Sequence, residues 1–272
     1  MLRRWIERLV RRRKLRLRVY FGTEQITVDL LSGGRRVQLV CGLAQPIDGA
    51  GRLDAAIAAL GEALRTLRAE AGDLRGLLCE VVLADGWIVY DVVAIDLLRV
   101  SQQSTGIAVA ATLEDVAGVH AGSMIVRWQW QRDGQGVFAM GIPRVTLAKL
   151  KATLAAAGVA VKSVTGEFVA VYNAQRTGFT GKRIVFAVGR EAGAQIAVMV
   201  DGMIRATRFE IGAGASVGLS NAAAGVMRAR GEDTTTPTDY VLDAIAEDAD
   251  SDPRWERLRP PAWTTAHRAP AQ

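Results

Sequence analysis

The sequence predicts a mixed α/β fold that is made of two similar units. Near the start, apolar and polar residues alternate on both sides of a glycine turn, which is the pattern of a β-hairpin. From Lys182 onward the same order returns: strand, glycine turn, strand, second turn and strand. A run with helical spacing follows each segment. A chain of 272 residues is long enough for such a duplicated fold with a large buried core.

The first unit is expected to begin with a hairpin and to continue through a helix. Leucines and an isoleucine share one face of residues 53–71, and Gly72 follows as a stop signal. The elements expected here are, in chain order, strands within Leu15–Leu31 about a turn at Gly22-Thr23-Glu24-Gln25, a strand over Val37–Gly42, the helix over 53–71, and strands over Gly76–Leu83 and Trp87–Val93 about an Asp85-Gly86 turn.

A small α+β insert is expected in the middle of the chain. One strand, Ser123–Gln131, carries four large apolar residues on one face and turns at an Asp-Gly pair into a second strand, Val137–Met140. A helix over Val145–Ala157 and a strand over Val159–Val164 follow. A tryptophan stripe of this kind can stack on bases or a sugar, but a sheet face packed on a helix is far commoner. The helix over Val145–Ala157 is the expected packing partner. The stripe consists of Met124, Val126, Trp128 and Trp130.

The second unit repeats the first pattern, and an acidic tail follows it. Its expected elements are strands over Arg183–Val188, Gln195–Val200 and Met203–Ile211, with turns at Gly189–Gly193 and Asp201-Gly202, and a helix over Ala215–Arg230. No further strand–helix unit is expected after about Gly231. Residues 232–252 contain eight acidic and no basic side chains, and the pattern predicts a short helix over Asp239–Ala246. Beyond Asp252, prolines recur and a largely disordered end is expected.

Composition argues against several classes of protein. No run approaches the roughly 20 apolar residues of a membrane-spanning helix, and no secretory signal is predicted. The two cysteines, Cys41 and Cys79, lie in strand-like runs and are expected to be free thiols in a reducing cytoplasm. Two histidines, His120 and His267, are too few for a structural zinc site, and no metal site is expected. His120 is expected to be a surface or turn residue.

The positive charge of the chain is concentrated at its start. Of 34 basic and 28 acidic residues, nine basic residues and Glu7 lie within residues 1–18, which leaves 25 basic and 27 acidic residues for the remainder. A near-neutral body does not support a broad nucleic-acid surface. The pattern of residues 1–14 predicts a basic amphipathic arm that contacts an anionic membrane or a partner protein. The alternatives are an arm that is only solvated and an arm that binds nucleic acid. The contact residues expected in the arm are Arg3, Arg4, Trp5, Ile6, Arg8, Leu9, Arg11, Arg12 and Arg13.

Three stretches resemble the actin-like (ribonuclease H-like) superfamily, and within it the PilM type of type IV pilus assembly proteins and the cytoplasmic part of the GspL secretion proteins. They are Leu17–Leu31 (LRVYFGTEQITVDLL), Gly158–Glu167 (GVAVKSVTGE) and Ile184–Gly212, and with 77–93 they cover about two thirds of the chain. The resemblance implies a degenerate, shortened actin-like fold. It also implies docking to a short cytoplasmic peptide of a bitopic, PilN-like inner-membrane protein and a link to the assembly motor.

The strand turns decide whether nucleotide chemistry is expected as well. In nucleotide-binding members of this superfamily, a D-x-G-type turn cradles phosphates and its aspartate holds the Mg²⁺ shell or orients water. Here Tyr20 and Ala187 stand where the acids are expected, and Mg²⁺ depends on such carboxylates. The turns at Gly22, Thr23 and Gly189 are therefore interpreted as vestigial, with no cofactor, no metal and no catalytic residue.

The function expected from these observations is a non-catalytic scaffold of type IV pilus or type II secretion assembly, cytoplasmic and peripheral at the inner membrane, with no nucleic-acid partner. The alternative is a divergent actin-like ATPase or kinase that binds Mg-ATP. The expected division is a basic arm (1–14), a first actin-like subdomain (15–106), an α+β insert (107–180), a truncated second subdomain (181–231) and the acidic, then proline-rich tail (232–272).

Overall fold

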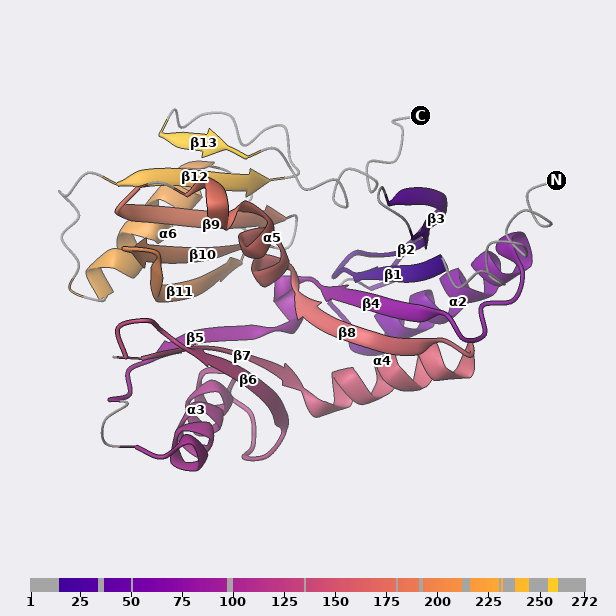
Figure 1. The fold of residues 1–272 in the computed structure, drawn as a ribbon, viewed down its shortest axis with the longest axis horizontal. Helices are drawn as coiled ribbons and strands as arrows, with labels where there is room; N and C mark the ends of the chain where they lie inside the picture. Colours follow the sequence, from indigo (N-terminus) through magenta and orange to yellow (C-terminus); the bar gives the residue numbers. More distant parts are fainter. Residues whose placement is uncertain are drawn as a thin grey trace. The chain divides into compact units, whose positions relative to one another are not determined.

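The computed structural model divides into two compact units. It describes residues 15–33, 37–49, 51–96, 100–134, 136–179, 181–190, 193–211, 216–229, 231, 238–244 and 254–258. In this part of the chain, unit 1 contains residues 15–84 and 145–167, and unit 2 contains residues 85–144 and 168–258. Each unit is therefore assembled from segments that are separated in the sequence (Figure 1).

Unit 1 is a five-stranded sheet covered by helices. The sheet order is β3-β2-β1-β4-β8, in which β1, β2 and β3 are antiparallel neighbours while β4 and β8 add in parallel. Its elements are β1 (Leu15–Phe21), β2 (Gln25–Ser32), β3 (Gln38–Pro46), α2 (Leu53–Ala71), β4 (Leu78–Leu83), α4 (Arg144–Ala156) and β8 (Ala160–Gly166). Strand β1 alternates between fully buried and half-buried residues, as expected for a strand with one face in the core.

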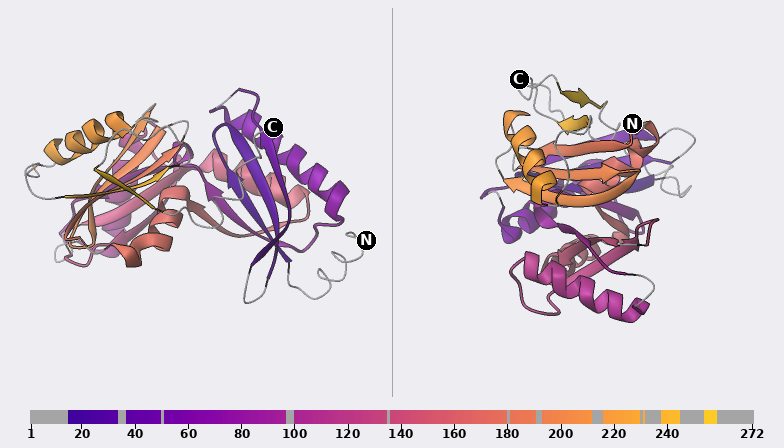
Figure 2. Two further views of the ribbon diagram at one scale, coloured as in Figure 1. Left: turned by 90° about the horizontal axis from the view of Figure 1, so that it is seen from above. Right: turned by 90° about the vertical axis from the view of Figure 1, so that its left-hand side faces the viewer.

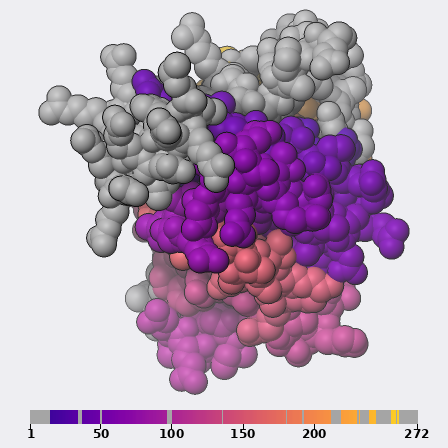
Figure 3. Space-filling model, turned by 90° about the vertical axis from the view of Figure 1, so that its right-hand side faces the viewer, coloured from indigo at the N-terminus to yellow at the C-terminus, as the bar shows by residue number. Residues whose placement is uncertain are grey.

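The two helices of unit 1 are amphipathic and lie side by side. The buried face of α2 packs on β2 and β3, and its buried residues include Leu60, Leu64 and Leu67. Helices α4 and α2 are in contact at two places. A Cβ atom added to Gly61 of α2 would lie 4.0 Å from Thr153 Cγ2 of α4, and Lys149 of α4 forms an ion pair with Asp54 of α2. In the space-filling view, the indigo to violet surface of residues 15–84 adjoins the salmon surface of residues 145–167 (Figure 3).

The second five-stranded sheet has the same topology as the first and belongs to unit 2. Its order is β11-β10-β9-β12-β13, again with three antiparallel strands and two added in parallel. Its elements are β9 (Arg183–Arg190), β10 (Gly193–Val200), β11 (Met203–Ile211), α6 (Ser216–Ala229), β12 (Asp239–Ala244) and β13 (Trp255–Arg257). Helix α6 packs on β10 and β11 (Figure 2).

The rest of unit 2 is a three-stranded sheet with its own helix. The sheet order is β5-β7-β6, and the elements are η1 (Asp85–Trp87), β5 (Val89–Val93), α3 (Gln102–Val116), β6 (Met124–Trp130), β7 (Val137–Pro143), α5 (Glu167–Gln175) and η2 (Arg176–Gly178). Met124, Val126, Trp128 and Trp130 pack in one cluster with Val109 and Leu113 of α3. The tryptophan stripe is therefore part of a sheet face packed on a helix, as predicted.

Several local predictions are wrong. The helix that covers the tryptophan stripe is α3, not the helix over Val145–Ala157, which lies in unit 1 as α4. Residues 76–83 and 87–93 do not form a hairpin, because β4 and β5 belong to different sheets. The predicted boundary between residues 106 and 107 falls inside α3, and β8 lies in the first sheet rather than in the insert.

Two described segments after residue 231 form strands that were not predicted. Residues 239–244 form strand β12 and not a helix, because they pair in parallel with β9 in the interior of the second sheet. Strand β13 then adds to β12, so the second sheet continues past Gly231, where the truncated second subdomain was expected to end. Residues 255–257 form a strand within the stretch that was expected to be largely disordered. The basic arm, residues 1–14, lies outside the described residues, and its contact residues stay a prediction.

Candidate functional site

The turn between β1 and β2 is held by two backbone hydrogen bonds, one within the turn and one from the segment that precedes α2. The Gly22 N–H donates to the Gln25 carbonyl oxygen at 3.1 Å, and the Thr23 carbonyl accepts from the Gly51 N–H at 3.0 Å. A Cβ on Gly22 would lie 2.3 Å from the Gln25 oxygen, so only glycine fits this turn. The Gly22 N–H that would face a phosphate in a nucleotide site is therefore already paired within the hairpin.

Tyr20, at the position where the resemblance predicts an acid, binds a buried glutamate. Its hydroxyl donates a hydrogen bond of 2.8 Å to Glu167 Oε2. Glu167 is 1% exposed and begins helix α5 directly after β8, where the positive end of a helix favours a carboxylate. Glu167 ends the GVAVKSVTGE stretch, but its spacing from Tyr20 in the sequence gave no sign that the two side chains meet.

Asp85 is a second buried acid, and it organises unit 2. It lies at the end of the segment that leaves β4 and is 6% exposed. Its Oδ1 accepts from the Tyr90 hydroxyl at 2.8 Å and from the Phe168 N–H in the first turn of α5 at 3.0 Å. Asp85 therefore holds β5 and α5 in place, a role that its prediction as a turn residue did not anticipate.

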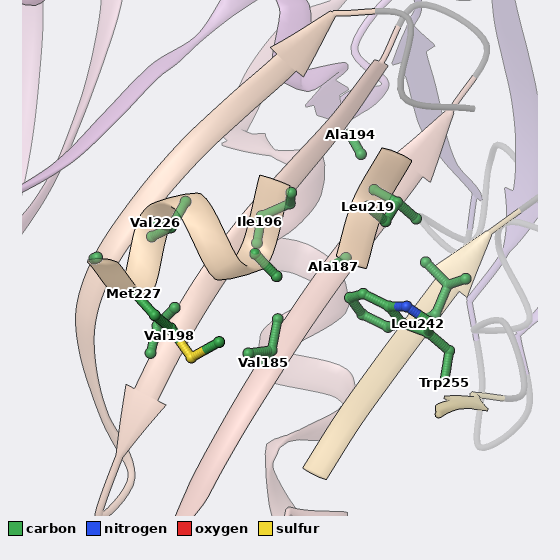
Figure 4. Packing of buried hydrophobic residues seen from close by; sticks show 12 residues of the cluster. Val185, Ala187, Ala194, Ile196, Val198, Leu219, Val226, Met227, Leu242 and Trp255 are labelled. Atoms are coloured by element: carbon green, nitrogen blue, oxygen red, sulfur yellow. The ribbon is translucent and has the colours of Figure 1, made fainter. Parts of the chain in front are cut away.

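The corresponding turn in unit 2 offers no polar group at the expected position. Ala187 is fully buried in an apolar cluster with Ile196, Leu219 and Leu242 (Figure 4). Gly189 is not in a turn but within β9, paired with Ala194 and Ala244. A carboxylate in place of Ala187 would be buried without a partner, which is costly.

The described residues around the two turns show no cluster of metal ligands. Within the described ranges there is no group of three or more His, Cys, Asp or Glu side chains that could hold a metal ion. His120 is exposed, and its carbonyl accepts from the Ser123 N–H in a turn, as predicted. Cys41 and Cys79 are free thiols. No helix of the described part is long and apolar enough to cross a membrane.

A charged network covers one face of the first sheet. Glu80 of β4 contacts three cations: Arg16 at 3.3 Å, Arg18 at 3.8 Å and Lys162 of β8 at 2.8 Å. Despite its partial burial, which alone would raise it, the pKa of Glu80 is lowered by these cations. Asp29 of β2 lies beside Arg18 in register but is 3% exposed, and burial raises its pKa to about 6.

Replacing Asp29 with asparagine is expected to stabilise the protein at neutral pH. Folding raises the pKa of Asp29, so the folded state binds the proton of this carboxyl group more tightly than the unfolded state does. The free energy of unfolding therefore falls as the pH rises from about 4 to about 6. The shift corresponds to about 1–3 kcal/mol of unfolding free energy at pH 7, which Asp29→Asn should recover. Urea unfolding at pH 7 measures the difference in unfolding free energy between Asp29→Asn and the wild type. This difference should shrink toward zero near pH 4.

An exposed acid in the same unit provides the control for this prediction. Asp48 is solvent-exposed, and Asp48→Asn should change the free energy of unfolding by less than about 0.5 kcal/mol at either pH. A variant Asp29→Asn that is less stable than the wild type at pH 7 would contradict the prediction, because it would mean that Arg18 outweighs the burial of the carboxylate.

Comparison with known proteins identifies the fold. No family model matches the sequence, and no curated protein matches it either. Among solved structures, the PilM-PilN type IV pilus biogenesis complex matches with a TM-score of 0.60 at 13% identity, covering 86% of this chain and 82% of the other. The fold is actin-like.

Two further solved structures agree with this assignment. The cytoplasmic domain of EpsL, an inner membrane component of the type II secretion system of Vibrio cholerae, matches with a TM-score of 0.57 at 13% identity and covers 90% of both chains. A Bacteroides thetaiotaomicron protein with an actin-like ATPase fold and unknown function matches with a TM-score of 0.57 at 10% identity, covering 88% of this chain and 86% of the other. The predicted resemblance in fold is confirmed, and the duplicated sheet topology is its actin-like core.

Proposed function

We propose that this chain is a non-catalytic adaptor in type IV pilus or type II secretion assembly. The observation that carries the proposal is the Tyr20–Glu167 hydrogen bond in an actin-like fold: a tyrosine stands where a metal-binding acid is expected, and it binds a buried carboxylate. The apolar surroundings of Ala187 point the same way. The likeness in fold to PilM and EpsL supports the assignment to this kind of machine.

The adaptor would act at the cytoplasmic face of the inner membrane. In this proposal the chain docks a short cytoplasmic segment of a bitopic, PilN-like inner-membrane protein and connects it to the assembly motor. The basic arm, with Trp5 and its arginines, would add contacts to the anionic membrane surface or to the partner. No nucleotide, metal or nucleic acid takes part.

Co-purification followed by calorimetry tests this function. The tagged chain is expected to recover a single-span inner-membrane assembly protein from detergent-solubilised membranes. A synthetic peptide of that protein's cytoplasmic segment should then bind the purified chain with a dissociation constant of about 1–100 μM, and a scrambled peptide should not bind. Failure of both steps would contradict the adaptor role.

A titration with Mg-ATP separates the adaptor from a divergent ATPase or kinase. We expect no binding heat from Mg-ATP, because Tyr20 and Ala187 stand at the two strand positions where the metal-binding acids are expected. The same titration of a Tyr20→Phe variant, which removes the hydrogen bond to Glu167, serves as the control and should also give no heat. A saturable isotherm with the wild type would favour the enzyme.

A further inference from the structure

One sheet edge in unit 1 lacks the protection that the other edges have. The exposed backbone of an edge strand can pair with another strand, and proteins prevent this with charged side chains or very short edge strands. Strand β8 carries Lys162, and β11 carries Arg205, Arg208 and Glu210. Strand β13 has only three residues. Strand β3, the remaining edge of the two five-stranded sheets, has no charged residue from Val37 to Ile47.

The exposed side chains of β3 and of Val37 before it are uncharged and mostly apolar, with Gln38 as the exposed polar one. Leu39 is 51% exposed and Val37 is 49% exposed, and Gly42, Ala44 and Pro46 are also exposed. Among the described residues β3 pairs with β2 alone. A nine-residue edge that carries no charge, with two glutamines as its polar residues, is a template for a further strand.

The backbone geometry identifies which groups of β3 are open. The Ile47 N–H donates to the Glu24 carbonyl at 2.7 Å, so at Ile47 the backbone points toward β2. Backbone groups alternate in direction along an antiparallel strand, so those of Gly42, Ala44 and Pro46 point away from β2. Pro46, which has no N–H to lose, fits an outward position. A bulge at Val40 interrupts the strand, which leaves Cys41–Pro46 as its regular part.

We propose that β3 pairs with β3 of a second copy of this chain, antiparallel and about a two-fold axis, to form a dimer with a continuous sheet across both copies. The alternation fixes the register, because Gly42 and Ala44 are the outward residues that have both an N–H donor and a carbonyl acceptor. Gly42 of each copy exchanges backbone hydrogen bonds with Ala44 of the other copy. Leu43 then lies on the axis and faces Leu43 of the second copy.

Charge explains why a second copy is the occupant. A partner strand that also carries no charge suits this edge, because a charge beside the apolar side chains of the edge finds no partner there. The chain supplies such a strand in β3 itself. Antiparallel pairing also places the two Asp48 residues at opposite ends of the ribbon, whereas parallel pairing would place them side by side. A single-strand interface is small, so the dimer is reversible and concentration-dependent.

Sedimentation of the full chain with two variants of one residue tests the dimer. Ala44→Pro removes an outward N–H and leaves the bonds to β2, so it should raise the dimer dissociation constant at least about tenfold. Ala44→Ser keeps the N–H and should leave the constant unchanged. A wild-type chain that stays monomeric up to about 100 μM would overturn the proposal. This holds both if the β3 edge stays open and if another segment of the same chain covers it. A dimer equally stable in Ala44→Pro would overturn the proposal too.

Cross-linking gives a second measurement that does not depend on the proline variant folding. In a Cys41→Ser background, Leu43→Cys places one thiol of each copy on the two-fold axis, at the spacing of a non-hydrogen-bonded pair. Diamide should convert this variant to a disulfide-linked dimer, and Cys41→Ser alone should stay uncross-linked, because Cys79 is buried and its pKa is raised to about 12. Absence of the cross-link in a sample that sediments as a dimer would overturn the proposed register and pairing. The result is independent of the adaptor function.

Discussion

Replacing Trp255 with alanine is expected to lower the free energy of unfolding by about 3–5 kcal/mol. Trp255 is 7% exposed in the apolar core of the second sheet, and its ring meets Tyr240 at a centroid distance of 5.2 Å. Its Nε1–H donates to the Ser220 hydroxyl at 2.9 Å, so the change also removes a buried hydrogen bond. Urea unfolding monitored by circular dichroism measures the loss.

The control for Trp255 is an exposed apolar residue of the same sheet. Ile211 is 84% exposed, and Ile211→Ala should change the free energy of unfolding by less than about 0.5 kcal/mol. If Trp255→Ala cost no more than Ile211→Ala, strand β13 would not be part of the folded core. A truncation after residue 231 removes β12 and β13 together and should prevent unit 2 from folding.

Replacing Phe168 with alanine is the second change with a large expected effect, a loss of about 3–5 kcal/mol. Its side chain is fully buried, with the rings of Phe186 at 5.4 Å, Tyr90 at 5.6 Å and Tyr172 at 6.3 Å between centroids. These rings come from β9, β5 and α5, so one cavity would loosen contacts among three elements of unit 2. Thermal and urea unfolding measure the loss.

A conservative substitution distinguishes packing from backbone effects at Phe168. Phe168→Leu keeps an apolar side chain in the cluster and should lose about 1–2 kcal/mol. The Phe168 N–H, which donates to Asp85, is retained in both variants. Equal losses for alanine and leucine would contradict the packing explanation, because the cavity left by leucine is much smaller.

The sequence predicted the elements whose signals are local. Glycine turns and alternating residues identified β1, β2, β9, β10 and β11, and the leucine spacing identified α2. The tryptophan stripe was correctly predicted to be a packed sheet face. In each case the residues that make the pattern are neighbours in the chain, so period and turn chemistry suffice.

The predictions that failed concern contacts between distant residues. Strand β12 has acidic neighbours and a short apolar run, and its place beside β9 follows from parallel pairing of residues 55 positions apart. Helix α3 was missed because residues 102–116 contain a glycine and several β-branched residues, which are poor helix formers, although Ser101 accepts from the Ser104 N–H as a helix cap. The Tyr20–Glu167 bond joins residues 147 positions apart, so no spacing rule could have found it.

The discontinuity of unit 1 sets the order in which the chain becomes foldable during synthesis. Strands β1 to β4 emerge from the ribosome first, but β8, which completes the sheet beside β4, follows only after the whole β5-α3-β6-β7 segment has been made. Until then the edge of β4 is open, and the long separation makes this last pairing the slow one. The inserted segment has its own helix and sheet, so it can fold early and bring β8 back to β4.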